Sequence, residues 1–187
     1  TSYDYNNLKP QITKAVWDAT GRELIIGGDI DLHVGLSPTL VLSDIKLQNA
    51  PWGSRSELVK TRLFEVKVSI FPLLIGNIAI KHLILVEPDI LVETNKSGKS
   101  NLEFETQLKT EQQQGAKKMP LEVLTKLPVL TFNKLKVEGG HLTYRDGRSG
   151  KSYEVLLNQF TAKSSGFDRP LEIALTGNFN NESFHVT

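Results

Sequence analysis

The sequence contains no cysteine among its 187 residues, which excludes disulfide scaffolds, thiolate zinc sites and cysteine nucleophiles. It has no apolar run near the roughly 18 residues of a membrane-spanning helix, so we expect no segment of it to cross a bilayer. Neither sign of charge is in excess, because 22 basic residues face 21 acidic ones. Proteins that bind phosphate backbones usually show a basic excess, so we expect no nucleic-acid partner.

The motifs of common enzymes are also missing. There is no Gly-x-Ser-x-Gly elbow and no His-Glu-x-x-His, and the four histidines are dispersed. Two Gly-Lys-Ser triplets, at 98–100 and 150–152, have Glu93 and Arg145 where a phosphate-binding loop needs glycine, so we interpret both as turns. Asp29 and Asp31 have no third ligand nearby and are interpreted as solvated strand residues. We therefore expect no catalytic residue, no metal site and no cofactor.

One amphipathic helix is predicted near the start, over residues 7–20. Its cap is expected at Asn6 or Asn7, Pro10 falls in the first turn, and Gly21 stands where a left-handed residue would end the helix. The apolar stripe of this helix consists of Leu8, Ile12, Ala15, Val16 and Ala19.

After the helix, apolar residues recur at every second position, which is typical of antiparallel strands with one buried and one wet face. The rows run through Leu24 to Val34, Phe64 to Ile70, Ile78 to Val86, Ile90 to Val92, Leu135 to Val137, Leu142 to Tyr144, Tyr153 to Leu157 and Leu171 to Leu175. His82 has the same parity as Ile80 and Ile84, so we expect a bulge that turns it outward.

The chain is predicted to have three parts. Residues 1–105 form a helix-plus-strands unit, 106–128 a polar linker with a possible short helix, and 129–187 a second stranded unit. Similar strands on both sides of the linker suggest that the sheet continues across it. Because the sequence starts at Thr1 rather than Met and stops within a strand pattern, we expect it to be a fragment.

A single helix is too small to cover the predicted sheet. About nine strands, each about 4.8 Å from the next, make a sheet about 43 Å wide. A helix of about 14 residues is only about 21 Å long and about 10 Å wide. The remaining apolar face must either close on itself as a sandwich or barrel, or curl into an open trough for an apolar ligand. Periodicity alone leaves both open.

Several motifs in order resemble the AsmA family of bacterial envelope proteins, over nearly the whole chain. They are Lys9-Pro10-Gln11-Ile12, residues 20–24, Gly28-Asp29-Ile30, Asn49-Ala50-Pro51-Trp52-Gly53, residues 72–78, Gly98-Lys99-Ser100-Asn101-Leu102 and residues 140–146. The chain departs from the family at Leu36-Ser37-Pro38, where a Trp- or Phe-containing turn is common, and it lacks the membrane helix usually found before the opening motif.

The resemblance implies a mainly β fold, with a long curved antiparallel sheet forming an open trough and the helix capping one end. It also implies a periplasmic protein, anchored in the inner membrane by the missing helix, that shields the acyl chains of phospholipid or another acyl lipid and so supports lipid transport to the outer membrane and envelope biogenesis. The expected trough residues are Ile30, Leu32, Val66, Val68, Ile70, Ile78, Ile80, Val92, Leu142, Tyr144, Val155 and Ile173. The alternative is a non-catalytic scaffolding domain with a closed β core that contacts envelope-assembly proteins.

Overall fold

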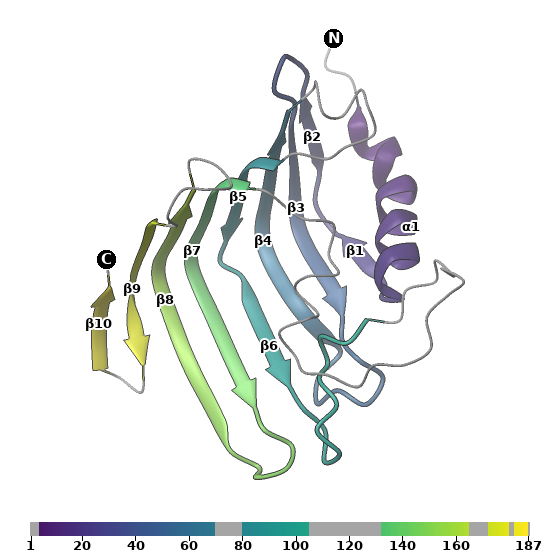
Figure 1. Cartoon of the computed structure of the whole chain (residues 1–187). Helices are drawn as coiled ribbons and strands as arrows, with labels where there is room; N and C mark the ends of the chain where they lie inside the picture. The colour runs from purple at the N-terminus through teal and green to yellow at the C-terminus, as the bar shows by residue number, and fades with distance from the viewer. Residues whose placement is uncertain (1–3, 70–79, 105–131, 165–171, 180–181, 187) are drawn as a thin grey trace, which may run out of the picture.

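The computed structural model describes residues 4–69, 80–104, 132–164, 172–179 and 182–186. One short 3₁₀ turn and one α-helix precede ten strands (Figure 1). These elements are η1 (Tyr5–Leu8), α1 (Lys9–Thr20), β1 (Leu24–Ile26), β2 (Ile30–His33), β3 (Thr39–Gln48), β4 (Glu57–Val68), β5 (Ile80–Val86), β6 (Asp89–Glu93), β7 (Phe132–Arg145), β8 (Ser152–Lys163), β9 (Glu172–Phe179) and β10 (Glu182–Val186). The predicted linker lies outside the described residues. Among the described residues, no helix is long and apolar enough to span a membrane.

The predicted helix is present, but its start differs from the prediction. Asp4, rather than Asn6 or Asn7, caps the first turn, because its carboxylate accepts a hydrogen bond from the Asn6 backbone N–H at 2.9 Å. The Asn6 side chain instead donates to Asp29 and accepts from the Ile30 backbone N–H, which ties the turn to β2. The helix ends at Gly21, which adopts the left-handed conformation at φ 63°, as predicted.

All ten strands belong to one sheet, in the order β1-β3-β4-β5-β7-β8-β9-β10, with β2 also beside β3 and β6 between β4 and β7. The prediction of a purely antiparallel sheet is wrong in one place, since β7 runs parallel to both β5 and β6. Two strands can pair in parallel only if the chain returns to the same end of the sheet between them. No sequence pattern indicated that return.

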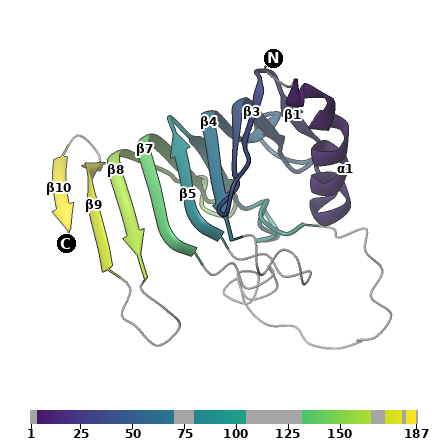
Figure 2. The same ribbon diagram turned by 90° about the horizontal axis from the view of Figure 1, so that it is seen from above.

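The sheet is curled rather than closed, and α1 lies at its β1 end (Figure 2). The stripe residues Leu8, Ile12 and Val16 pack against a buried cluster on the concave face. That cluster consists of Leu24, Ile26, Ile30, Leu42 and Ile45, with Leu40, Leu47, Phe64 and Tyr5 beside it. Ala15 and Ala19, which were predicted to belong to the stripe, are exposed. The helix therefore roofs only the first strands.

A single row of residues interrupts the alternation at the same level on five neighbouring strand segments. We call this row the crease; the pairing registers place Asp44, Arg62, Glu87, Gly139 and Asn158 in it. Asp44, Glu87 and Gly139 have left-handed backbones, with φ of 48°, 52° and 64°, a conformation that L-residues rarely adopt. Arg62 and Glu87 form an ion pair at 3.1 Å, and Asn158 is an extra residue of β8 relative to β9.

The crease keeps apolar side chains on the concave face of both halves of the sheet. Leu42 and Ile45 are three residues apart, an odd spacing that would normally place them on opposite faces, yet both lie in the buried cluster. A Cβ built on Gly140 would lie 3.0 Å from Cγ1 of Val137, so these two positions also share a face. A parity count that ignores the crease therefore assigns half of each long strand to the wrong face.

His82 lies on the convex face because of a second irregularity at the start of β5. Val68 pairs with Ile80 and Lys67 pairs with His82, so Lys81 is an extra residue and forms a bulge. The predicted outward bulge is thus confirmed. The predicted row of Ile80, Ile84 and Val86 is wrong, because Ile84 and Val86 share the face of His82 while Ile80 faces the other way.

Candidate functional site

The concave face carries continuous apolar ladders that cross most of the sheet. Residues that pair on adjacent strands point to the same face, so each ladder follows from the registers. Above the crease, one ladder contains Ile30, Leu42, Phe64, Leu85, Val137, Phe160, Leu175 and Val186, and the next contains Leu32, Leu40, Val66, Leu83, Leu135, Ala162 and Ile173. Below the crease, a third contains Leu24, Leu47, Val59, Ile90, Leu142, Val155 and Phe179. Two residues farther down the strands, Val92, Tyr144 and Tyr153 form a short fourth ladder, in which the centroids of the two tyrosine rings lie 6.3 Å apart.

The structure gathers ten of the twelve expected trough residues on this one face. They are Ile30, Leu32, Val66, Val68, Ile80, Val92, Leu142, Tyr144, Val155 and Ile173. Ile70 and Ile78 lie outside the described residues. Sequence reasoning did not select Phe64, Leu85, Phe160 or Phe179 for the trough, although they occupy the same ladders. The signal that could have located them is a one-residue shift in the alternation of apolar and polar positions beside a mid-strand glycine, Asn or Asp.

The solvent exposure of the concave face increases from the strands beside α1 to the strands β7–β10. Leu24, Ile30 and Leu42, near α1, are each less than a tenth exposed. At the other end, five large apolar side chains on the same face are open to solvent. Their exposed fractions are 39% for Tyr144, 41% for Tyr153, 42% for Ile173, 41% for Phe179 and 52% for Val186. Within the part of the chain that the structure describes, these residues form an apolar surface without a roof, which usually marks a binding surface.

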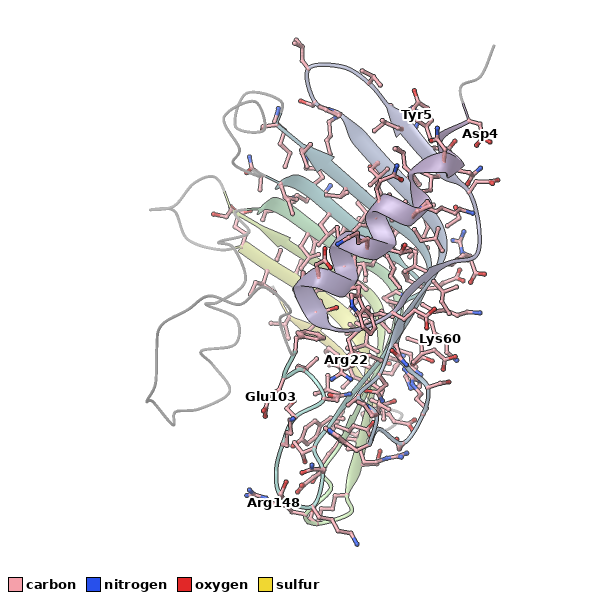
Figure 3. The ribbon with its side chains drawn as sticks, turned by 90° about the vertical axis from the view of Figure 1, so that its right-hand side faces the viewer. Asp4, Tyr5, Arg22, Lys60, Glu103 and Arg148 are labelled. Carbon is pink, nitrogen blue, oxygen red and sulfur yellow. The ribbon has the colours of Figure 1, made fainter. Side chains whose placement is uncertain are left out.

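The convex face is mostly polar, and Figure 3 shows Lys60 on that side of the sheet. Both carboxylate oxygens of Asp89 accept hydrogen bonds from Nη1 of Arg55 at 2.9 Å, and Oδ1 of Asp89 lies 3.9 Å from Nδ1 of His141. His141 also lies 3.8 Å from Glu154, and it is half-buried. Arg55 occupies both carboxylate oxygens of Asp89, and Nε2 of His141 is buried without a hydrogen-bond partner among the described residues.

A buried polar network ties the β3–β4 connection to β6. Asn101 is fully buried; its side chain accepts from the Glu93 backbone N–H at 3.0 Å and donates to the Leu91 carbonyl at 2.8 Å. It also donates to Oδ1 of Asn49 at 3.0 Å, and Asn49 in turn donates to Glu93 at 2.8 Å. Arg22 closes the network by donating to the Asn49 carbonyl at 2.9 Å. Three of the motifs that carry the family resemblance, at 20–24, 49–53 and 98–102, therefore meet here in a structural role.

Glu93 is the one titratable centre of this network with a shifted acidity. Burial raises its pKa, but hydrogen bonds from the Ser54 backbone and from Asn49 outweigh that effect and hold the pKa below the usual carboxyl range. The carboxylate is therefore ionised, and its Oε1 accepts two hydrogen bonds, which suits a structural anchor. A general acid would need the opposite shift.

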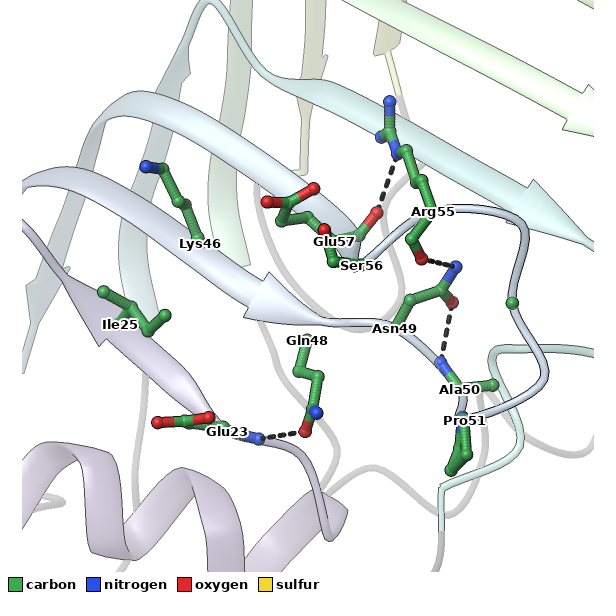
Figure 4. Close-up of a pocket in the computed structure, with 11 residues that line it drawn as sticks. Glu23, Ile25, Lys46, Gln48, Asn49, Ala50, Pro51, Arg55, Ser56 and Glu57 are labelled. Atoms are coloured by element: carbon green, nitrogen blue, oxygen red, sulfur yellow. Dashed lines mark hydrogen bonds between the residues drawn. The ribbon is translucent and has the colours of Figure 1, made fainter.

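A shallow pocket of about 440 Å³ lies beside this network, on the convex side (Figure 4). Two hydrogen bonds join its lining residues: Asn49 donates to the Arg55 carbonyl at 3.1 Å, and Arg55 donates to the Glu57 carbonyl at 2.7 Å. Ile25 and Lys46 are among the residues that line it. It is separate from the apolar ladders and holds no pair of groups suited to acid–base chemistry.

The two Gly-Lys-Ser triplets and the pair Asp29 and Asp31 have the local structures that the sequence analysis predicted. Gly98 and Gly150 have φ of 85° and 72° and occupy turns, as expected for the two Gly-Lys-Ser triplets. Asp29 and Asp31 are exposed, and the described residues contain no cluster of three or more His, Asp or Glu side chains that could hold a metal.

Comparison with known proteins agrees with the motifs. The sequence profile of the AsmA family matches residues 2–186, so the chain belongs to that family. A search of curated proteins finds no match to this chain. The AsmA family is associated with the cell envelope and is not a known enzyme family.

Proposed function

We propose that this member of the AsmA family shields the acyl chains of phospholipid, or of another acyl lipid, against its concave face and so carries lipid within the envelope. The observation that supports this most directly is the set of apolar ladders that continue onto β7–β10, where Ile173, Phe179 and Val186 lie open. A closed core would leave no such surface. The periplasm, between two membranes, is the compartment where such a carrier is of use.

The energetics of this role require only apolar contact. Moving one methylene from hydrocarbon to water costs about 0.8 kcal/mol, so a 16-carbon chain faces roughly 12 kcal/mol when fully exposed. Ladders of Leu, Ile, Val and Phe remove most of that cost while the headgroup stays in water. No bond is made or broken, which is consistent with the absence of a catalytic constellation in the sequence.

Lipid extraction with a matched pair of variants tests the proposal. The purified protein is extracted and its lipids are identified by mass spectrometry, with stoichiometric phospholipid expected. Ile173→Glu places a charge on the open concave face and should reduce the lipid content several-fold while the fold survives. Leu156→Glu is the control, since Leu156 is 49% exposed but lies on the convex face of the adjacent strand, where it pairs with His141 and Asn178.

Two results would contradict the proposal. An empty wild-type protein that binds envelope proteins would favour the scaffolding alternative. Equal lipid content in Ile173→Glu and Leu156→Glu would mean that the lipid is held somewhere other than the concave face.

A further inference from the structure

A row of basic side chains crosses the convex face at the upper end of the sheet, the end where β4 and β8 finish and β5 and β7 begin (Figure 1). We call it the basic row: Lys67, His82, Lys134 and Lys163, which are direct neighbours in the registers. Four strands at about 4.8 Å spacing place these groups within about 14 Å. Lys163 is exposed and the others are partly exposed.

Only one member of the basic row, Lys163, has an acidic residue directly opposite it among the described residues. None of its members takes part in an ion pair there. The acidic neighbours on this face are Glu172, which pairs in register with Lys163, and Glu65, two residues from Lys67, while Glu138 is engaged by Lys136. Like charges on directly opposed strand positions destabilise a sheet, so a bound anionic surface would relieve a cost already present in the fold.

An exposed apolar loop lies beside the basic row. Val34 and Leu36, in the β2–β3 connection, are 77% and 79% exposed, the two highest values among the large apolar residues that the structure describes. Gly35 between them has open space around it. The loop is fixed next to the basic row, because Ser37 accepts a hydrogen bond from Lys81 at 2.7 Å and Pro38 accepts one from the Val68 backbone N–H at 3.0 Å.

We infer that this upper end docks onto the surface of an anionic phospholipid bilayer, with Val34 and Leu36 entering the interface and the basic row contacting lipid phosphates. Basic groups beside exposed apolar side chains are the combination that interfacial binding requires. A nucleic acid or an acidic protein would account for the lysines but not for Val34 and Leu36. The inference deepens the proposed function, on which its use rests, because the concave ladders end at Val68 and Ile80 and so reach the docked end.

Vesicle flotation with the whole chain tests the electrostatic half. The wild type should bind vesicles of phosphatidylcholine mixed with phosphatidylglycerol, and should bind phosphatidylcholine alone far more weakly. Each Lys near an anionic surface is worth roughly fivefold in affinity, so K67Q/K134Q/K163Q should bind on the order of 100-fold more weakly. The matched control is K46Q/K96Q/K151Q, which removes the same charge from positions away from the basic row and should stay within a few-fold of wild type.

The apolar half is tested by Val34→Ser with Leu36→Ser. This variant should lose about tenfold or more in affinity for the same vesicles, and the remaining binding should still fall with salt, since its electrostatic part is intact. Both substitutions are at exposed positions, so circular dichroism should show an unchanged fold.

The inference is overturned if the wild type fails to bind anionic vesicles at low salt, or if the two triple-lysine variants weaken equally. It is also overturned if Val34→Ser/Leu36→Ser has no effect while polyglutamate competes for the basic row, since an acidic protein would then be the partner. Lipid content after extraction is a separate readout. If the protein binds vesicles but contains no extracted lipid, the proposed function is wrong and this inference stands. If it contains lipid but does not bind vesicles, this inference is wrong and the proposed function stands.

Discussion

Leu42 and Leu175 belong to the same apolar ladder, yet Leu42 is 3% exposed and Leu175 is only partly buried. Leu42 lies in the part of the sheet that α1 covers, which we call the roofed wall. Leu175 lies in the β7–β10 part, which no described element covers and which we call the open wall. The side chains are equally apolar at both ends, so composition does not distinguish a core from a binding surface. The difference comes from where the only described helix lies.

The largest expected effect comes from placing a charge at each end of this ladder. Leu42→Asp buries an unpaired carboxylate beside Ile30 and Ile45 and should cost about 4 kcal/mol or more, a large part of the stability of a domain this size. Leu175→Asp should cost much less, because water reaches that site. Urea unfolding followed by circular dichroism measures both, and equal losses would mean that the open wall is as buried as the roofed one.

A smaller loss is expected where the two walls are joined. Asn101→Ala removes the partners of the Leu91 carbonyl, the Glu93 backbone N–H and the Asn49 side chain, all at buried positions. The cost should be about 2 to 3 kcal/mol in the same unfolding assay. Gln159→Ala on exposed β8 is the control and should change the free energy of unfolding by less than about 0.5 kcal/mol. A similar loss in both variants would show that the network is not a special anchor.

Loosening the roof should affect one wall only. Ile12→Ala removes an apolar contact between α1 and the buried cluster and should cost about 1 to 2 kcal/mol, since Ile12 is only partly buried. Amide hydrogen exchange should then accelerate in β1–β3 and stay unchanged in β8 and β9. Uniform acceleration over the sheet would mean that both walls unfold as one unit.

The smallest expected effect is on the pH dependence of the unfolding free energy, to which Glu93 contributes through the buried network with Asn49 and Asn101. Its pKa is lower in the folded protein than in the unfolded chain, so protonation favours unfolding. The stability it contributes is present above the ordinary carboxyl pKa of about 4.3 and is lost as the pH falls through the lower folded pKa. Glu93→Gln should therefore flatten the dependence of unfolding free energy on pH as the pH falls below about 5. An unchanged slope would assign the acid sensitivity to other carboxylates.

Local patterns predicted the local parts of this fold. The period of two found the strands, the stripe of Leu8, Ile12 and Val16 found the helix, and His82 revealed its bulge because a polar residue interrupted an apolar row. Each of these depends on residues close together in the sequence. The sheet that continues across the predicted linker is confirmed by the pairing of β5 with β7.

The misses depend on contacts between distant residues. The parallel return of β7 and the meeting of Asn49 with Asn101 are set by how the chain folds back, which one sequence does not display. The cap at Asp4 competes with Asn6 and Asn7, all of them good capping residues, and the contact of Asn6 with Ile30 decided among them. Whether the concave residues hold lipid stays a prediction until it is measured.

The crease has a consequence for how such a chain can change over generations. Because Asp44, Glu87, Gly139 and Asn158 stand at one level on neighbouring strands, deleting any one of them would leave the residue opposite it on the next strand unpaired and break the register between the two strands. Single-codon losses at these positions should therefore be purged, whereas losses in the surface turns should be tolerated. We therefore expect insertions or deletions at the crease to be retained only when the neighbouring strands change by the same number of residues.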